Sequence, residues 1–218
     1  CYQAGESYYA AGQVYQAYPY YQEISPYTDV TLSPWLAANG VLMSGQIRHN
    51  FSQGSTELKG SFIDDRYSFE GFLNWDISDV WRFKTNIDYA SDDTYLRRYD
   101  LRDDYAPWLT SDAGFEALTS DVYFYAGGAY YRNMRANVND DTVPRAFPLM
   151  TFAQNTDADF GGYWSVGASS AVLTRKIGDD SSRLSLEGGY HLPGIADWGA
   201  AYSFDATALV NGYKVKDY

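Results

Sequence analysis

Side chains alternate between apolar and polar character from Tyr67 to Ala90, and this alternation constrains the fold more than any other feature of the sequence. Successive side chains of a β-strand point to opposite faces, so such a segment has one apolar, aromatic-rich face and one charged face. The alternation pauses at Ser78 and Asp79 and then resumes. Each half is about ten residues long, the length that a tilted strand needs to cross a bilayer. The segment therefore predicts a membrane-length hairpin.

The composition of the chain favours strands over helices. Its 218 residues include 22 Tyr and 19 Gly but only 3 Met, and aromatic residues are enriched in strands. No apolar run approaches the ~18 residues that a transmembrane helix needs. The formal net charge of −12 argues against nucleic acid as a partner, because phosphate binding requires clustered Lys and Arg.

Strand-like runs with a period of two follow one another along most of the chain. They are separated by turn signals that include Ser25-Pro26-Tyr27, Gly127-Gly128 and Pro193-Gly194. The runs cover 12–21, 28–37, 40–50, 55–64, 67–77, 80–91, 113–125, 128–138, 145–153, 161–175, 182–191 and 198–212. We therefore predict an all-β fold, an antiparallel meander of about ten to twelve strands that forms part of a large transmembrane outer-membrane β-barrel.

The chain has no segment that resembles a linker, so residues 1–218 are expected to form one partial barrel domain. The longest irregular segment is about 93–111. Outer-membrane barrels place long loops outside the cell and short turns in the periplasm. On this rule the short turn between Ile77 and Val80 is periplasmic, and the segment 93–111 is extracellular.

Catalytic and metal-binding signatures are missing from the sequence. Its histidines, His49 and His191, are far apart, and there is no Gly-x-Ser-x-Gly motif or metal-ligand spacing. Paired acids such as Asp64-Asp65 lie between the strand-like runs and are interpreted as solvated loop tips. Cys1 has no internal partner. We predict no enzyme activity, no cofactor and no metal.

Several short motifs occur in one order along residues 18–192, and together they resemble a known family. They are Tyr18-Pro19-Tyr20-Tyr21, Asp29-Val30-Thr31-Leu32-Ser33-Pro34, Ser91-Asp92-Asp93-Thr94-Tyr95-Leu96-Arg97-Arg98-Tyr99, Asp141-Thr142-Val143-Pro144, Phe160-Gly161-Gly162 and Arg183-Leu184-Ser185-Leu186. In this order they resemble the early barrel strands of the LPS-assembly protein LptD family, also called the organic solvent tolerance protein family, in its alphaproteobacterial form.

The resemblance implies transport and assembly of lipopolysaccharide in the cell outer membrane of Gram-negative bacteria. In this family the barrel contacts outer-membrane lipids and releases lipopolysaccharide sideways through a lateral gate. The lipoprotein LptE plugs the barrel, and the bridge protein LptA delivers the lipid to a periplasmic jelly-roll domain. The chain corresponds to the N-terminal part of the barrel, without the jelly-roll domain or the closing strands.

Two prolines are the candidate lateral gate. The resemblance places Pro19 and Pro34 on neighbouring strands near the seam between the first and last strands. A proline cannot donate a hydrogen bond to a β-ladder, so each removes about 1 kcal/mol of net pairing. The alternative is structural: Pro19 ends a strand and Pro34 marks a bulge.

Three further groups of residues are candidates for membrane and transport roles. Aromatic residues collect at membrane–water interfaces, and polar residues line barrel interiors. The predicted interfacial aromatics are Tyr67, Trp75, Trp81, Tyr89, Trp164 and Tyr190. The predicted lumen-facing residues are Glu70, Asn74, Asp76, Arg82, Lys84, Asn86 and Asp88. The predicted extracellular-loop cations are Arg97, Arg98 and Arg102, which either meet lipid phosphates or are neutralised by Asp100, Asp103 and Asp104.

Two other functions fit the same pattern of strands. The first is a generic outer-membrane porin or receptor barrel that acts as a passive channel, which the ordered motifs with Pro19 and Pro34 disfavour. The second is a soluble all-β binding module, in which the aromatic faces would pack against a second sheet.

Overall fold

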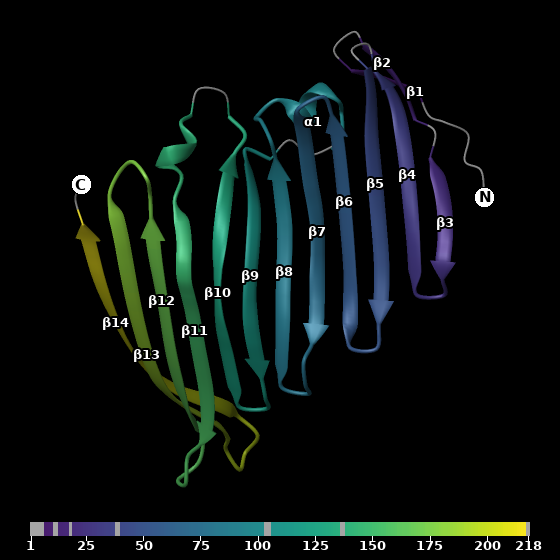
Figure 1. Ribbon diagram of the computed structural model, residues 1–218. Coiled ribbons are helices and arrows are strands. Elements are labelled where there is room, and N and C mark those ends of the chain that lie inside the picture. Colours follow the sequence, from purple (N-terminus) through teal and green to yellow (C-terminus); the bar gives the residue numbers. More distant parts are fainter. Residues whose placement is uncertain are drawn as a thin grey trace. The chain divides into compact units, whose positions relative to one another are not determined.

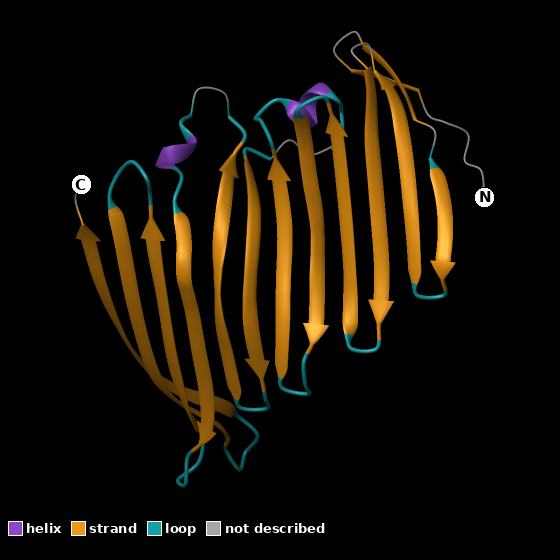
Figure 2. Ribbon diagram, viewed as in Figure 1, coloured by secondary structure: helices purple, strands orange, loops and turns teal. Residues whose placement is uncertain are grey.

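The computed structural model of the chain describes most of its residues. The described ranges are 7–10, 13–17, 19–37, 40–102, 106–135 and 138–216. Cys1, Tyr18, Asp103 and Asp104, which were named from the sequence, lie outside them. Within the described part, strands dominate and the only helical turns are short (Figure 2). In that same part, no helix combines the length and the apolar character needed to span a bilayer.

The strands follow one another in an antiparallel meander (Figure 1). The three short strands at the N-terminal end are β1 (Ser7–Ala10), β2 (Gln13–Ala17) and β3 (Tyr20–Ser25). The long strands are β4 (Thr28–Ala37), β5 (Gly40–Phe51), β6 (Gly54–Ile63), β7 (Arg66–Asp76), β8 (Trp81–Ala90), β9 (Trp108–Leu118), β10 (Val122–Asn133), β11 (Arg145–Asp157), β12 (Tyr163–Thr174), β13 (Asp180–Ile195) and β14 (Ala201–Lys216). The predicted all-β meander is confirmed.

The β7–β8 hairpin corresponds to the alternating segment that predicted it. Its turn is closed by the N–H of Ile77, which donates to the carbonyl of Trp81 at 2.8 Å, and by Ser78 Oγ, which accepts from the Trp81 N–H at 3.1 Å. At the other end, the Ser91 N–H donates to the carbonyl of Tyr67 at 2.8 Å. Both halves are strands over almost the whole alternating segment.

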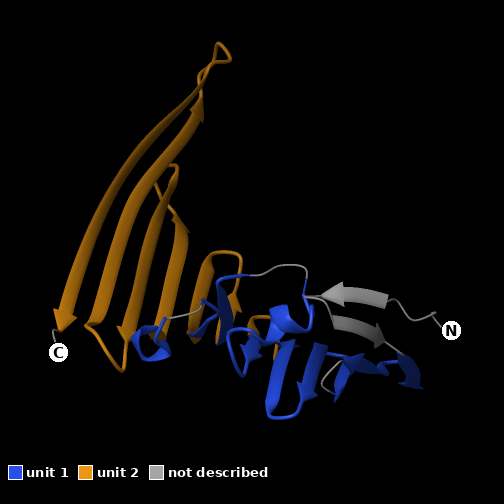
Figure 3. Ribbon diagram, turned by 90° about the horizontal axis from the view of Figure 1, so that it is seen from above, with its two compact units in different colours: residues 1–76, 83–113, 130–143 blue, residues 77–82, 114–129, 144–218 orange. Residues whose placement is uncertain are grey.

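The chain divides into two compact units (Figure 3). Unit 1 contains residues 1–76, 83–113 and 130–143, and unit 2 contains residues 77–82, 114–129 and 144–218. In unit 1, β4 to β7 pair in constant register, with Thr31 opposite Gln46 and Lys59 opposite Glu70. In unit 2, β12 to β14 pair in the same way over up to sixteen residue pairs, and the β11–β12 ladder shifts its register between Ala146 and Leu149.

A small hydrophobic core lies in unit 1, where the segment after β8 folds against the sheet. The segment contains the short helix α1 (Tyr95–Arg98), part of the long irregular connection that the sequence predicted. Its side chains are buried together with residues of the strands. The core consists of Leu42, Ile63, Ala90, Tyr95, Leu96, Tyr99, Leu109 and Met134.

Two glycine-based turn predictions are wrong. Gly127 and Gly128 lie inside β10, and the preceding turn is at 119–121 instead. A Cβ on Gly128 would meet the carbonyl oxygen of Ala146 at 3.0 Å, so this glycine allows close strand approach rather than a turn. Likewise Pro193 and Gly194 lie inside β13, and the Cβ of a larger residue at 194 would collide with the Tyr202 ring.

The core predicts that truncation of two leucines, one on β4 and one on β5, lowers the free energy of unfolding by very different amounts. Leu42 is 1% exposed and Leu36 is 50% exposed. Leu42→Ala should lower the free energy of unfolding by about 2–5 kcal/mol, because it leaves a cavity under α1. Leu36→Ala should cost less than half as much. Urea unfolding of the protein in detergent micelles checks this, and equal losses for the two variants would contradict the packing described.

Candidate functional site: a broken strand pairing and a layered polar face

The pairing along β4 is interrupted at the two candidate gate prolines. Ala17 of β2 pairs with Trp35, and Tyr20 of β3 pairs with Leu32. The two short strands therefore keep one register against β4, as a single strand would. Among the described residues, no pair joins Ser33 or Pro34 to β2 or β3.

This interruption corrects the prediction of one continuous strand over 12–21. Pro19 lies between β2 and β3 and outside both. In the register of the flanking pairs, position 19 would face Ser33, and position 18 would face Pro34. Neither proline has an N–H to donate, and because neighbouring residues of a strand direct their N–H groups to opposite sides, one of the two prolines removes a hydrogen bond from this ladder. Pro34 itself stays in the ladder with β5, opposite Met43.

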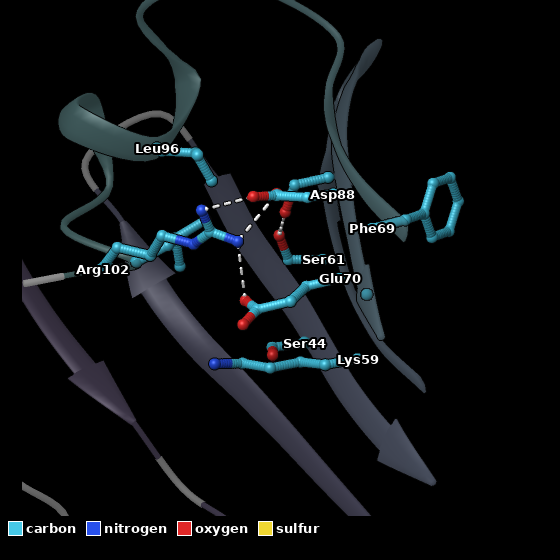
Figure 4. Close-up of a pocket in the computed structure, with 11 residues that line it drawn as sticks. Ser44, Lys59, Ser61, Phe69, Glu70, Asp88, Leu96 and Arg102 are labelled. Atoms are coloured by element: carbon cyan, nitrogen blue, oxygen red, sulfur yellow. Dashed lines mark hydrogen bonds and ion pairs between the residues drawn. The ribbon is translucent and has the colours of Figure 1, made fainter. Parts of the chain in front are cut away.

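One guanidinium group shows that the even-numbered residues of β7 and β8 share a face. Arg102 donates to Asp88 through both terminal nitrogens, at 3.0 and 2.8 Å, and forms an ion pair with Glu70 at 3.1 Å (Figure 4). Glu70 also lies opposite Lys59. Arg82, another predicted lumen-facing residue, belongs to unit 2. By strand alternation, the face that carries Glu70 and Asp88 also carries Asn74, Asp76, Lys84 and Asn86. We call this face of unit 1 the polar face.

Arg102 lies on the polar face and is 14% exposed. Burial lowers the pKa of its guanidinium, but the hydrogen bonds and charges of Asp88 and Glu70 raise it more, so the group stays charged. From the sequence, loop acids were the expected partners of Arg102. The two partners found are strand residues, and only the folding-back of the connection brings Arg102 to them.

A row of hydroxyl groups lies beside the charged residues on the same face. Ser61 Oγ is 2.8 Å from Ser68 Oγ and 3.0 Å from the Tyr95 hydroxyl. Burial raises the pKa of Tyr95. Together with Ser44, Lys59 and Arg102, these serines line a hollow of about 20 Å³, which has room for little more than one water molecule (Figure 4). Sequence reasoning missed this row, because nothing in the local pattern showed that Tyr95 would reach β6.

Arg97 and Arg98 of α1 are exposed, unlike Arg102. Arg97 donates to the carbonyl of Met134 at 3.3 Å, and the Arg98 guanidinium lies 5.8 Å from the centre of the Tyr99 ring. The three loop cations are thus not equivalent. Two belong to the outer surface of the helical turn, and the third fixes the connection to the polar face.

The predicted interfacial aromatics lie near strand ends. Trp75, Trp81 and Trp164 are each between 42% and 47% exposed and lie close to short turns. Tyr67 stacks on Tyr89 at 6.1 Å near the opposite end of β7. Two ends with exposed aromatic rings are the arrangement that an interfacial girdle requires.

The Trp164 and Tyr190 pair extends the same pattern in unit 2. The residues are cross-strand partners with ring centres 4.8 Å apart. The Tyr190 hydroxyl donates to the carbonyl of Gly161 at 2.6 Å, and Phe160 packs on its ring at 5.3 Å. An apolar body with a hydrogen-bonded polar tip is the form that these side chains take at a membrane surface.

The described residues contain no group of three or more His, Cys, Asp or Glu arranged to hold a metal ion. Both histidines are tied into side-chain networks. His49 contacts the Thr28 hydroxyl at 2.7 Å, and His191 bridges Ser165 and Asp205. The main chemical feature of unit 1 is instead a sheet with one polar and one apolar face, in which the pairing of β4 with β2 and β3 is interrupted.

Comparison with known proteins gives this arrangement a context. The family model described as LptD, LPS transport system D, matches residues 64–218. The chain belongs to the LptD family. Pro19 and Pro34 precede the residues matched by the LptD model.

Curated relatives agree with the family. The LPS-assembly protein LptD of Acinetobacter baumannii is 29% identical over 193 residues, which cover 80% of this chain and 23% of that protein. LptD proteins of Acinetobacter baylyi and Alkalilimnicola ehrlichii are 30% and 33% identical over 98 and 89 residues, or 39% and 37% of the chain. The chain spans less than a quarter of the length of each. Its alphaproteobacterial character stays a prediction.

The Arg102 bridge should contribute more to stability than an exposed ion pair on the same sheet. Arg102→Met removes the cation that bridges Asp88 and Glu70, and should cost about 1–3 kcal/mol. Arg48, which pairs with Asp29 at 2.9 Å and is 48% exposed, is the matched control, and Arg48→Met should cost less than Arg102→Met. A double-mutant cycle with Asp88→Asn measures the coupling, and a coupling near zero would contradict this assignment.

The segment before α1 should lose stability in acid. Burial raises the pKa of Asp92, but hydrogen bonds from the Thr94 hydroxyl and N–H and the charge of Arg66 outweigh it, so the pKa lies below its usual value of 3.8. A lowered pKa stabilises the folded state above the unfolded value, and this stability is lost as the pH falls through the folded value. Thr94→Val should therefore move the Asp92 pKa upward in an NMR titration of carboxyl carbons. An unchanged pKa would refute the role of Thr94.

Proposed function

We propose that this chain is part of the outer-membrane barrel that inserts lipopolysaccharide into the outer leaflet, and that the lipid leaves beside the interrupted β2/β3–β4 pairing. The observation that carries the proposal is the interruption of pairing opposite Ser33 among the described residues, with Pro19 at the break. The family places the chain among lipopolysaccharide transport proteins. The strands are long enough to cross a bilayer.

The two faces of the sheet support a membrane location. The face opposite the polar face carries half-exposed apolar side chains, among them Leu58, Phe62 and Phe69. Exposed apolar groups on this scale are unfavourable in water and favourable against acyl chains. In this proposal the polar face is the lumen wall, and the aromatic residues near the strand ends mark the two membrane surfaces.

The partners follow from this orientation. A lumen wall with alternating charges offers many hydrogen-bonding groups to a plug such as LptE. Delivery through LptA would involve other parts of longer LptD proteins, because the curated relatives are more than four times the length matched here. The end of the sheet that carries α1 would face outward, with Arg97 and Arg98 near the lipid headgroups.

The test replaces both prolines in the complete encoded protein. Pro19→Ala with Pro34→Ala restores two N–H donors, of which one points into the β2/β3–β4 ladder, and should stabilise the closed pairing by about 1 kcal/mol, roughly a fivefold shift toward the closed state. We expect slower appearance of lipopolysaccharide at the cell surface, measured by pulse labelling and immunodetection.

The matched control is Pro193→Ala. Pro193 lies in β13 opposite Ser203, away from the interrupted pairing, and should leave delivery unchanged. Surface expression of each variant is measured in the same cells. Normal delivery by a well-expressed double variant would refute the lateral exit, and a passive channel would then be the better description of the barrel.

A further inference from the structure

A hollow of about 620 Å³ opens in unit 2 where the turn 119–121 meets the end of β11. The N–H of Asn155 donates to the carbonyl of Asp121 at 2.9 Å and holds the turn against the strand. The volume is within the range of small-molecule sites. The lining residues are Thr119, Asp121, Val122, Gln154, Asn155, Thr156, Asp157 and Tyr163.

The lining selects one class of ligand by its chemistry. It offers carboxylates, side-chain amides, hydroxyls and an aromatic ring, and none of the eight residues is basic. Two carboxylates without a cation repel phosphate and carboxylate ligands. Carboxylates accept hydrogen bonds, and amides both donate and accept. An uncharged ligand with many hydroxyl groups can donate hydrogen bonds to these carboxylates and can exchange hydrogen bonds with these amides.

Tyr163 forms the aromatic wall of the hollow, and a neighbouring network fixes its ring. The ring stacks on His191 with centres 4.8 Å apart and planes at 21°. His191 is clamped from both sides, by Ser165 Oγ at 3.0 Å from Nε2 and by Asp205 Oδ1 at 2.8 Å from Nδ1. A Cβ on Gly189 would approach Ser165 Oγ to 2.7 Å, so the glycine keeps this contact open.

Ser165, His191 and Asp205 are the residue types of a hydrolytic triad, but their position in the sheet differs from that of a catalytic site. Ser165 is the third residue of β12, inside the sheet, and pairs with Asn155 on one side and Gly189 on the other. Backbone N–H groups at such a position are used by the ladders, whereas an oxyanion hole needs donors that are free to face the reacting oxygen. The network is therefore better suited to holding His191 than to nucleophilic attack.

We propose that this hollow binds uncharged polyhydroxyl units, with Tyr163 as the stacking wall and with Asn155 and Asp157 among its hydrogen-bond partners. His191 is a positioning residue that acts through Tyr163. The source of the ligand rests on the proposed function: the hexose units of the transported lipid have this chemistry, whereas its phosphate groups do not. In this proposal, residues of β11 and β12 contact the sugar units of the transported lipid.

The direct test is binding of a phosphate-free hexose oligosaccharide to the complete protein in detergent micelles, followed by saturation-transfer NMR and equilibrium dialysis. We expect saturable binding that weakens roughly tenfold in Tyr163→Ala, because one stacked wall is lost. Tyr163→Phe should retain binding. His191→Ala should weaken binding less than Tyr163→Ala and should broaden the Tyr163 ring signals, which a purely structural role elsewhere would not do.

The matched control is Thr151→Ala, an exposed residue on β11 outside the hollow, which should bind like the wild type. Lack of saturable binding, equal binding by Tyr163→Ala, tighter binding of a phosphorylated oligosaccharide, or equal competition by glycerol would each overturn the proposal. The assay involves no export. If sugar binding is absent but lipopolysaccharide delivery is normal, only the proposed sugar site is refuted. If the proline experiment fails, only the proposed lateral exit is refuted, and the sugar-binding result still holds.

Discussion

Backbone hydrogen bonding is the constraint on which the rest of this structure depends. A sheet that faces hydrocarbon must pair its N–H and C=O groups internally, because the lipid offers no alternative partner. Most of the described strands meet this requirement with long, constant registers, such as the sixteen pairs between β13 and β14. Among the described residues where β4 meets β2 and β3, the ladder is interrupted at Pro19, opposite Ser33. A local loss of pairing in an otherwise continuous sheet is a place where strands can separate at low cost.

The polar face holds the irregular connection after β8 through three kinds of contact. Along β5 to β8 it changes from a charged zone to a row of hydroxyls and then to an apolar zone covered by α1. Arg102 joins the connection to the charged zone, Tyr95 joins it to the hydroxyls, and Leu96 joins it to the core. Each layer offers a different contact, and the three together hold an irregular segment against a regular sheet.

The sequence predicted the strands well where alternation was strong and flanking turns were short. The β7–β8 hairpin and β4 were expected almost residue by residue, because one apolar and one polar face leave only one register. Prediction failed at Gly127-Gly128 and Pro193-Gly194, where glycine serves close strand approach, which local sequence cannot distinguish from a turn. It also missed the fold-back of Tyr95 and Arg102 and the stacking of Tyr163 on His191. These contacts join residues separated by 14 to 34 positions, and only tertiary structure brings them together.

The central claim is that the pairing of β2 and β3 with β4 is weaker than the pairing elsewhere in unit 1. Amide hydrogen exchange of the complete protein in lipid nanodiscs measures this directly. The account predicts that amides of β3 and the facing part of β4 exchange about fivefold faster than those of β5 and β6, since one missing hydrogen bond lowers the opening free energy by about 1 kcal/mol. Replacing both prolines by alanine should remove most of this difference. Equal protection of the two strand pairs in the unmodified protein would contradict the account.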